Sequence, residues 1–201
     1  VKKAGAKLKF AAEPFCFGEF TLSSAGGRYV LTGCSQIESF FDLRSGLEKY
    51  YAGCVMLDAV SRFEEKDANP PVFLLLLKSL QSLLSQSSGL VLLKFMLDFL
   101  EKSGYRAELD GCNQCGSTNF DKLFYDSSFE SFVCPACRTA QSQLLSPPVL
   151  STLKMTEKIP LEKITVIKVK DEYIKQALAV LGLYAAPRIS KLKSLDHFLS
   201  L

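Results

Sequence analysis

The residues most able to do chemistry in this chain are four cysteines in two closely spaced pairs. Cys112 and Cys115 form one C-x-x-C pair, Cys134 and Cys137 form the other, and residues 116–133 separate them. A tight turn with two intervening residues points both sulfurs of a pair toward one point, so two such turns supply four thiolates in a tetrahedron. Zn²⁺ suits this arrangement because it has no directional preference of its own. The spacing therefore predicts one structural zinc bound by all four cysteines.

Two other interpretations of these cysteines are weaker. Paired disulfides require an oxidising compartment, and the odd total of seven cysteines argues against one, since Cys16, Cys34 and Cys54 are scattered. A catalytic zinc keeps one position open for water, whereas four cysteines fill all four positions. The only histidine, His197, lies far away in the sequence. A structural site is therefore favoured.

The segment between the two pairs has the pattern of a short β-hairpin. In a strand over residues 122–126 Leu123 and Tyr125 would share one face, and in a strand over residues 129–133 Phe129 and Val133 would share one face. The polar residues 126–128 between them indicate a turn. A hairpin with a cysteine pair near each end resembles a zinc ribbon. We therefore expect a zinc-binding segment over residues 112–137.

Composition limits the class of protein. The chain has 201 residues, 48% of them hydrophobic and 15 of them Phe, which is enough for one large or two small domains. No apolar run reaches the length of a membrane span and no signal peptide opens the chain, so we expect a cytoplasmic protein without membrane contact. There is no Gly-rich phosphate loop and no Ser-His-Asp pattern, so no catalytic residue is predicted and the chain is not expected to be an enzyme.

The first part of the chain is predicted to form short β-strands and to carry positive charge. Apolar residues alternate with others along residues 7–10, 15–22 and 28–31. Residues 1–33 hold five Lys and Arg against two acidic residues, residues 34–149 hold ten against fourteen, and residues 150–201 hold nine against five. Basic ends around an acidic middle suggest an anionic partner at the ends.

Five basic residues near the N-terminus are candidates for contact with nucleic acid. They are Lys2, Lys3, Lys7, Lys9 and Arg28, and they lie among aromatic residues. Proteins bind single strands with cations for the phosphates and rings for the bases. The alternative is a half-buried sheet with Phe inside and Lys outside, and on this stretch alone that alternative is favoured.

From residue 34 onward the pattern is helical. Apolar periodicity changes from two to about 3.6 at residues 32–33, and Ser35 with Glu38 predicts a capping box at a helix start. Gly104 is predicted to end a helix in the C′ position. The expected fold is thus α+β, with a partial N-terminal β-barrel over residues 1–33 and a helical domain over residues 34–201. Helices are expected from Ser35 until Gly46 breaks the pattern, and near residues 47–63, 72–85, 90–102, 147–156, 171–183 and 189–199. Residues 161–169 are compatible with helix or strand, and the helices at 72–85 and 90–102 are expected to be buried.

Several segments together resemble the RecO family of bacterial recombination mediators. They are E-P-F-C-F-G-E-F at 13–20, R-Y-V-L-T at 28–32, I-E-S-F-F-D-L-R-S-G-L-E-K-Y at 37–50, L-D-F-L-E-K-S-G-Y-R-A-E-L-D-G-C-N-Q-C-G at 97–116, C-P-A-C at 134–137 and L-K-S-L at 192–195. The run from helix to first cysteine pair is the most specific of these, because C-x-x-C pairs alone are shared with many proteins.

The resemblance implies an N-terminal OB-fold, a helical C-terminal domain and a zinc site in members that keep the cysteines. It also implies that further residues precede the point matching Val1, so the first barrel strands are expected to be absent from this sequence. The implied activities are binding of single- and double-stranded DNA, annealing of complementary strands, and loading of recombinase onto DNA coated by single-strand-binding protein. The implied partners are the mediator RecR and the C-terminal tail of the single-strand-binding protein, and the implied location is the cytoplasm at the nucleoid.

Two functional hypotheses follow. The first is a non-catalytic, DNA-binding recombination mediator. The second is a protein-interaction scaffold, in which a zinc-stapled helical domain holds partner peptides and the basic ends are incidental. Binding of single-stranded oligonucleotides at two salt concentrations separates them, because phosphate contacts make affinity depend on salt.

Overall fold

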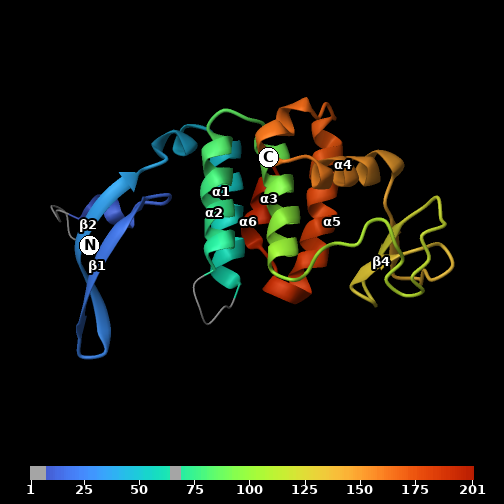
Figure 1. Cartoon of the computed structure of the whole chain (residues 1–201), viewed down its shortest axis with the longest axis horizontal. Helices are drawn as coiled ribbons and strands as arrows, with labels where there is room; N and C mark the ends of the chain where they lie inside the picture. The colour runs from blue at the N-terminus through green and yellow to red at the C-terminus, as the bar shows by residue number, and fades with distance from the viewer. Residues whose placement is uncertain (1–7, 64–68) are drawn as a thin grey trace. The chain divides into compact units, whose positions relative to one another are not determined.

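Two units are distinguished in the computed structural model, one built on a β-hairpin and one built on helices. The structure describes residues 8–63 and 69–201, and the units are residues Val1–Gly46 and Leu47–Leu201. Figure 1 shows strands β1 and β2 in the first unit, and helices with a small sheet in the second. The mixed helix and sheet content agrees with the predicted α+β class.

A long antiparallel hairpin forms most of the first unit. Strand β1 (Phe17–Ala25) pairs with β2 (Arg28–Glu38), with Ala25 opposite Arg28 across a two-residue turn. The turn residues Gly26 and Gly27 have φ values of 57° and 75°, which a type I′ turn requires and which glycine adopts without strain. Two short 3₁₀ helices flank the hairpin, η1 (Lys9–Ala12) and η2 (Phe41–Ser45).

Two local predictions in this unit are wrong. The strand expected over residues 7–10 does not form in its described part, because Leu8 lies in a turn and η1 begins at Lys9. Ser35 with Glu38 lies inside β2 rather than at a helix start. The Glu38 carboxylate accepts hydrogen bonds from the backbone N–H groups of Ser39 (2.7 Å) and Phe40 (3.1 Å), at the end of the strand. Pairing with β1 supplies backbone partners that the local capping pattern cannot reveal, and the first α-helix begins only at Leu47.

The hairpin exposes large apolar side chains. Buried residues in this unit are Phe15, Phe40 and Leu43, at or beyond the ends of the strands. A two-stranded sheet is marginally stable at best by itself. The described residues form no closed barrel, so the predicted OB-fold over residues 1–33 is not established by this hairpin. The exposed apolar residues on the strands are Phe20, Leu22, Tyr29, Val30 and Ile37.

The second unit packs its helices around α3. Helix α3 (Ser88–Lys102) contacts α1 (Leu47–Arg62), α2 (Pro70–Leu83), α4 (Pro147–Lys158), α5 (Asp171–Ile189) and the 3₁₀ helix η3 (Leu161–Val166), while α6 (Lys193–Leu199) packs on α1. In Figure 1, α2, α3 and α5 stand side by side and α4 crosses toward the small sheet. Within the described residues, no helix combines the length and apolar character that a membrane crossing requires.

The predicted helix boundaries at α2 and α3 are well explained by their caps. Two prolines open α2, and the Asn69 side chain accepts a hydrogen bond from the backbone of Val72 at 3.0 Å. At the end of α3, Gly104 has φ 81° and Tyr105 N–H donates to the Leu100 carbonyl at 2.7 Å, which is a Schellman motif. The prediction of Gly104 at C′ is therefore confirmed. Helix α3 is buried as expected, whereas α2 is buried on one side only and exposes Phe73 and Leu74.

A small sheet between α3 and α4 carries the cysteines. Strands β4 (Ser131–Val133) and β5 (Ser142–Leu144) pair antiparallel on either side of β3 (Phe124–Asp126). The predicted hairpin is confirmed as β3 and β4, and β5 is an additional strand that its polar sequence did not indicate. We call residues 103–146, which connect α3 to α4, the cysteine lobe.

The cysteine lobe docks on the C-terminal half of α5 through aromatic side chains. The rings of Phe132 and Tyr184 stack with centroids 5.2 Å apart, and the Tyr184 hydroxyl donates to the Arg106 carbonyl at 3.0 Å. The Arg188 guanidinium lies over the Tyr184 ring at 3.8 Å and donates to the Glu130 carbonyl at 2.9 Å. These contacts join the lobe to the helical core.

Pro187 lies inside α5 and does not end it, contrary to the expectation of a helix over residues 171–183. A proline has no N–H, so the Leu183 carbonyl four residues earlier loses its helical donor. The Tyr125 hydroxyl, from β3, donates to this Leu183 carbonyl at 3.0 Å. The side chain from the lobe thus replaces the missing backbone donor, which allows the helix to continue to Ile189.

This replacement predicts coupling between Tyr125 and Pro187. Tyr125→Phe should lower the free energy of unfolding by about 1–2 kcal/mol, because it leaves a part-buried carbonyl without a donor. Pro187→Ala restores an N–H, so it should be more stabilising in the Tyr125→Phe background than in the wild type, by about 1 kcal/mol. Urea unfolding of the four proteins measures this coupling. The exposed Tyr105→Phe serves as control, and additive effects of the two substitutions would contradict the interpretation.

Candidate metal centre

The two cysteine pairs fold as tight turns that face each other. In the first, Gly116 N–H donates to the Cys112 carbonyl at 2.8 Å, and Gly116 has φ 70°. In the second, Cys137 N–H donates to the Cys134 carbonyl at 3.1 Å. The backbone N–H of Cys134 also points at the Cys112 sulfur, at 3.3 Å. The turns are thus fixed by backbone hydrogen bonds, as the C-x-x-C spacing predicts.

The four sulfurs converge on one point. All four Sγ atoms lie within 4.8 Å of one another, and those of Cys115 and Cys134 are 3.8 Å apart. Four thiolates around zinc, each about 2.3 Å from the ion, would have sulfurs about 3.8 Å apart. Cys112 and Cys134 are buried, Cys137 is half-buried and Cys115 is exposed. The donor set and its spacing therefore fit a tetrahedral metal ion. Among the described residues, these four cysteines are the cluster of potential metal ligands.

The thiols of this cluster have strongly different proton affinities. Burial disfavours the Cys112 thiolate, but backbone N–H groups of Cys134, Cys115 and Gln114 point at its sulfur and lower its pKa to about 6. Hydrogen bonding with Cys115, burial, and the nearby sulfurs of Cys134 and Cys112 raise the pKa of Cys137 to about 12. Several thiolates close together repel one another, which disfavours their simultaneous deprotonation. A bound cation offsets this repulsion.

A small apolar core holds the cysteines against the sheet. Cys112 and Cys134 pack with Phe124 of β3 and Val133 of β4, and Phe120 and Cys137 lie against this cluster. This cluster of four buried side chains supplies little hydrophobic stabilisation by itself, and other buried residues of the lobe, such as Phe132, pack on α5 instead. The fold of the lobe therefore depends on its cross-links and on its docking to α5.

One of these cross-links is the buried carboxylate of Asp126. Its side chain is 0% exposed. One oxygen accepts from the backbone of Ser128 (2.9 Å) and Phe129 (3.3 Å), and the other accepts from the Thr139 backbone (3.1 Å), the Thr139 hydroxyl (2.6 Å) and the Ser142 hydroxyl. The carboxylate thus ties the β3–β4 turn to β5 and to the segment after Cys137. Asp before Ser-Ser predicted the turn, but no sequence pattern linked it to Thr139 and Ser142.

The five basic residues predicted to contact DNA are described only in part. Lys2, Lys3 and Lys7 lie outside the described residues. Lys9 lies in η1 and Arg28 begins β2, and both side chains are exposed. Their role in DNA binding stays a prediction.

The C-terminal basic residues are mostly engaged within the fold. Arg188 is held against Tyr184 and the lobe, and Lys191 pairs with Asp196 at 2.9 Å. Lys193 is exposed at the start of α6. His197 is exposed and lies beside the Tyr51 ring, with centroids 5.9 Å apart, as expected for a surface histidine. Arg188 in particular connects α5 to the cysteine lobe, a role that its position in the sequence did not indicate.

Comparison with known proteins identifies a family match over most of the helical unit. Residues 44–196 match the family model described as Recombination protein O C terminal. The match begins within η2 and ends within α6, and it includes the cysteine lobe.

Several curated proteins with similar sequences are named DNA repair protein RecO. A DNA repair protein RecO of Dehalococcoides mccartyi strain 195 is 28% identical over 184 residues, which cover 88% of this chain and 71% of that protein. The protein of that name from Dehalococcoides mccartyi strain BAV1 is 30% identical over 158 residues, covering 77% and 62%. The one from Clostridium novyi is 25% identical over 201 residues, covering 98% and 78%. The chain therefore spans between 62% and 78% of the length of these relatives.

The Asp126 network predicts a stability that depends on pH. Burial opposes its charge, but the hydrogen bonds from Ser142, Thr139 and Ser128 outweigh this and hold the pKa of Asp126 well below its usual range. The carboxylate therefore stabilises the fold above the unfolded-state pKa of about 4, and this contribution is lost as the pH falls below it. Asp126→Asn should lower the melting temperature by several degrees at pH 7.

The difference between Asp126→Asn and the wild type should shrink on acidification toward pH 3, because the wild type then progressively loses the stabilisation that the carboxylate supplies. Thermal unfolding followed by circular dichroism measures it. Asp121→Asn removes an exposed carboxylate five residues upstream and should change little at either pH. Equal effects of the two substitutions would argue against a structural role for Asp126.

Proposed function

Because the chain belongs to the RecO family, we propose that it acts as a DNA-binding recombination mediator in DNA repair and has no catalytic activity of its own. The observation that carries the proposal is the family match over residues 44–196, together with relatives named DNA repair protein RecO. The chemistry of the site agrees, because a set of four cysteines leaves no open metal position for a substrate or water. We place the protein in the cytoplasm, at the nucleoid.

The first unit is proposed to belong to an OB-fold that binds single- and double-stranded DNA. A twisted hairpin with exposed apolar side chains on its strands is what part of a larger barrel presents. The proposed DNA contacts are Lys2, Lys3, Lys7, Lys9 and Arg28, which would neutralise phosphates without reading bases. Holding two strands in this way would support annealing of complementary DNA.

The proposed partners are a RecR-type mediator and the acidic C-terminal tail of single-strand-binding protein. Together they would direct recombinase onto coated single-stranded DNA. The helical pattern of the sequence makes residues 36–103 and 171–199 one candidate surface for the tail. Exposed Phe73 and Leu74 on α2 give those helices an apolar surface, and Lys78 and Lys102 lie with Leu74 around a pocket there.

We propose that the metal at the four cysteines is zinc and that its role is structural. Held by four thiolates, zinc supplies a cross-link between the two turns and no reactive ligand. The sulfur distances and the lobe's small apolar core support this assignment. Removing the metal should release the turns, and with them the packing of Phe124 and Val133.

The zinc assignment predicts a specific loss on substitution. Cys115→Ser should remove about one zinc per chain and lower the melting temperature, because metal binding at such sites is coupled to folding. The metal content of protein purified without chelator and a thermal scan measure both effects. Cys54→Ser, in α1 and away from the cluster, should keep the metal. A wild-type protein without bound zinc would overturn the assignment.

The DNA proposal predicts a change in salt dependence. Each phosphate neutralised on a single strand adds about 0.7 to the slope of log affinity against log salt concentration. Replacing Lys2, Lys3, Lys7 and Lys9 by Ala should therefore reduce the slope by up to about 3 and leave sequence preference unchanged. Fluorescence anisotropy with a labelled oligonucleotide measures it.

The matched control for this experiment removes four lysines from the helical unit. Lys163, Lys168, Lys170 and Lys175 lie in or near η3 and α5, outside the first unit. Their replacement by Ala should leave the slope near the wild-type value. An unchanged slope in the N-terminal variant and a reduced one in the control would move the DNA surface to the helices. Absence of salt-dependent binding in the wild type would favour the alternative function, a zinc-stapled interaction scaffold without direct DNA binding.

A further inference from the structure

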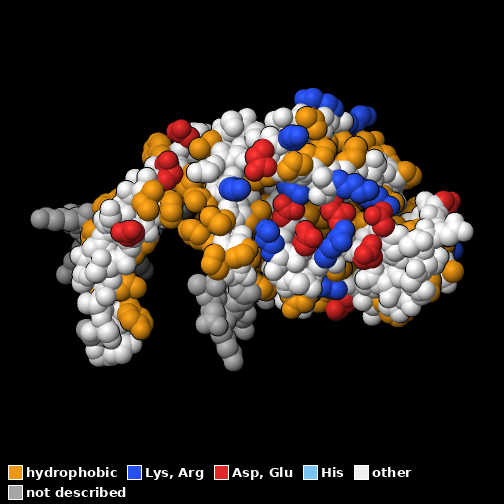
Figure 2. Space-filling model, viewed as in Figure 1, with side chains coloured by type: hydrophobic (Ala, Val, Ile, Leu, Met, Phe, Trp, Pro, Cys, Tyr) orange, Lys and Arg blue, Asp and Glu red, His pale blue; other side chains and the backbone are white. Residues whose placement is uncertain are grey.

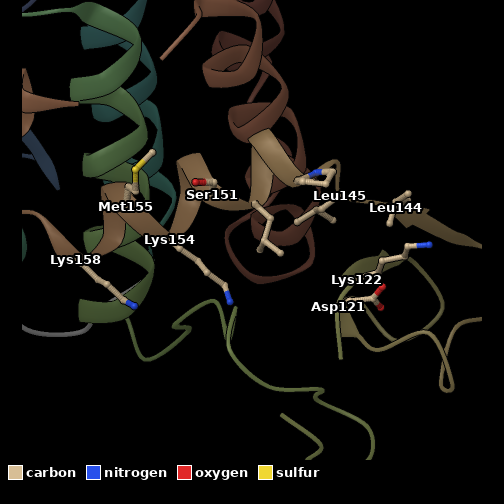
Figure 3. A pocket seen from close by; sticks show the side chains of 10 residues that line it. Asp121, Lys122, Leu144, Leu145, Ser151, Lys154, Met155 and Lys158 are labelled. Carbon is tan, nitrogen blue, oxygen red and sulfur yellow. The ribbon is translucent and has the colours of Figure 1, made fainter. Parts of the chain in front are cut away.

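A pocket of about 400 Å³ lies between the cysteine lobe and α4. Leu144 and Leu145, from β5 and the residue after it, form the wall on the lobe side, and Leu150 and Met155 form the wall on the α4 side. Figure 3 shows Ser151, Lys154 and Met155 on one side of the pocket and Leu144 and Leu145 on the other. The pocket therefore belongs to both elements, and neither forms it alone.

The pocket combines an aliphatic lining with a basic rim. Leu144 is 48% exposed and Met155 is 40% exposed, so both offer apolar surface to a ligand. Figure 3 shows Lys122 on the lobe side and Lys154 and Lys158 along α4. Among the residues that line the pocket, Asp121 is the one acidic side chain, and Asp110 lies near Lys154 and Lys158.

Of the three lysines, only Lys154 has a described ion pair, with Asp110 at 2.7 Å. That contact leaves Lys122 and Lys158, both exposed, to attract a ligand's negative charge. Peptide-binding pockets usually combine an apolar interior, from which water is excluded, with charged groups at the edge. The charge complementarity thus points to an acidic partner.

The lining selects peptide over nucleic acid. Proteins hold single-stranded nucleic acid largely by stacking bases on aromatic rings. The side chains that line this pocket are aliphatic, polar or charged, and none is aromatic. An apolar side chain fits such a lining, whereas an unstacked base gains little there.

We propose that this pocket binds an acidic peptide segment through one of its apolar side chains, and that binding requires the cysteine lobe to be held by its metal. The inference extends the proposed partnership with an acidic protein tail, and in that respect it rests on the proposed function. It places the tail's site outside the helices of residues 36–103 and 171–199.

The dependence on metal follows from how the lobe wall is supported. Leu144 pairs with Phe124 across β5 and β3, and Leu145 N–H donates to the Leu123 carbonyl at 3.0 Å. Phe124 in turn packs directly on Cys112 and Cys134. Release of the cysteines therefore loosens the strand that positions Leu144. The α4 wall is anchored separately, by buried Val149 and Leu153.

The pocket is tested with a fluorescein-labelled peptide of Asp and Gly that ends in Phe, and with a second peptide in which Ser replaces that Phe. The first should bind with salt-dependent affinity, and the second at least about tenfold more weakly. Met155→Asp, Leu144→Asp and the double variant Lys122→Glu, Lys158→Glu should each lower affinity about tenfold or more. Val166→Asp and Lys163→Glu change exposed residues away from the pocket and should stay within about twofold of the wild type.

The metal arm compares the wild type before and after treatment with a chelator, and with Cys115→Ser. Peptide affinity should fall about tenfold or more while circular dichroism still reports the helices, and added zinc should restore the chelated wild type. Undiminished binding by metal-free protein, or a purified protein that holds no metal, would overturn the metal requirement. Because Met155→Asp leaves the cysteines intact, the pocket itself is tested even if Cys115→Ser does not fold.

Parallel titrations with oligonucleotide separate this inference from the proposed function. Pocket variants that lose peptide but keep DNA binding support it, and absence of peptide binding at about 1 mM overturns it. If the pocket variants instead lose oligonucleotide binding and keep the peptide, the pocket is a nucleic-acid surface and the proposal is wrong. A protein that binds the peptide but no DNA would overturn the proposed function and leave the pocket standing.

Discussion

The burial of α3 is the constraint on which the helical unit depends. Eleven of its fifteen residues are buried, because α1, α2, α4, α5 and η3 surround it. A helix that is apolar on nearly all sides has no stable position except inside such a shell. One charged group within it, Lys94, is also buried, and it pairs with Asp98 at 2.7 Å and donates to the Glu157 carbonyl at 3.0 Å.

The buried Lys94 side chain also links α3 to α4. Glu157 lies in the last turn of α4, where carbonyls lack helical donors, so the Lys94 ammonium caps one helix from inside another. Burial raises the pKa of Asp98 in spite of the attraction of Lys94, which shows how far this pair is removed from water. Removal of Asp98 would leave a desolvated charge on Lys94, and the hydrogen bond from Lys94 to the Glu157 carbonyl links α3 to the end of α4. The same hydrogen bond therefore helps to position the α4 residues that line the pocket.

The sequence predicted those parts of the fold whose signals are local. The C-x-x-C pairs, the turn at residues 126–128 and Gly104 at the end of α3 each depend on a few neighbouring residues, and the structure has them where they were expected. The strand over Ser35 and Glu38 was missed because pairing with β1 overrides a local capping pattern. Helix α5 continues through Pro187 because Tyr125, distant in sequence, supplies a donor to Leu183. The pocket could not be predicted because its two walls meet only through tertiary packing.

The two units differ in their balance of basic and acidic residues. Residues 1–46 carry six Lys and Arg against four acidic residues, whereas residues 47–201 carry eighteen against seventeen. Figure 2 shows both signs interleaved over the helical unit, in agreement with ion pairs such as Lys78–Glu162 and Arg106–Glu157. Exposed pairs contribute little stability, but they cancel the long-range field that would attract a polyanion.

A metal held by four thiolates would lower the net charge of the helical unit further, since a divalent ion does not balance four negative sulfurs. In the proposed function, general attraction to phosphates would therefore come mainly from the first unit, where the basic residues outnumber the acidic ones. The lysines around the pocket are a local cluster on a unit whose charges are nearly balanced, so their attraction acts over a short distance. The two proposed roles, DNA binding by the first unit and peptide binding by the pocket, match this difference in the range over which their charges act.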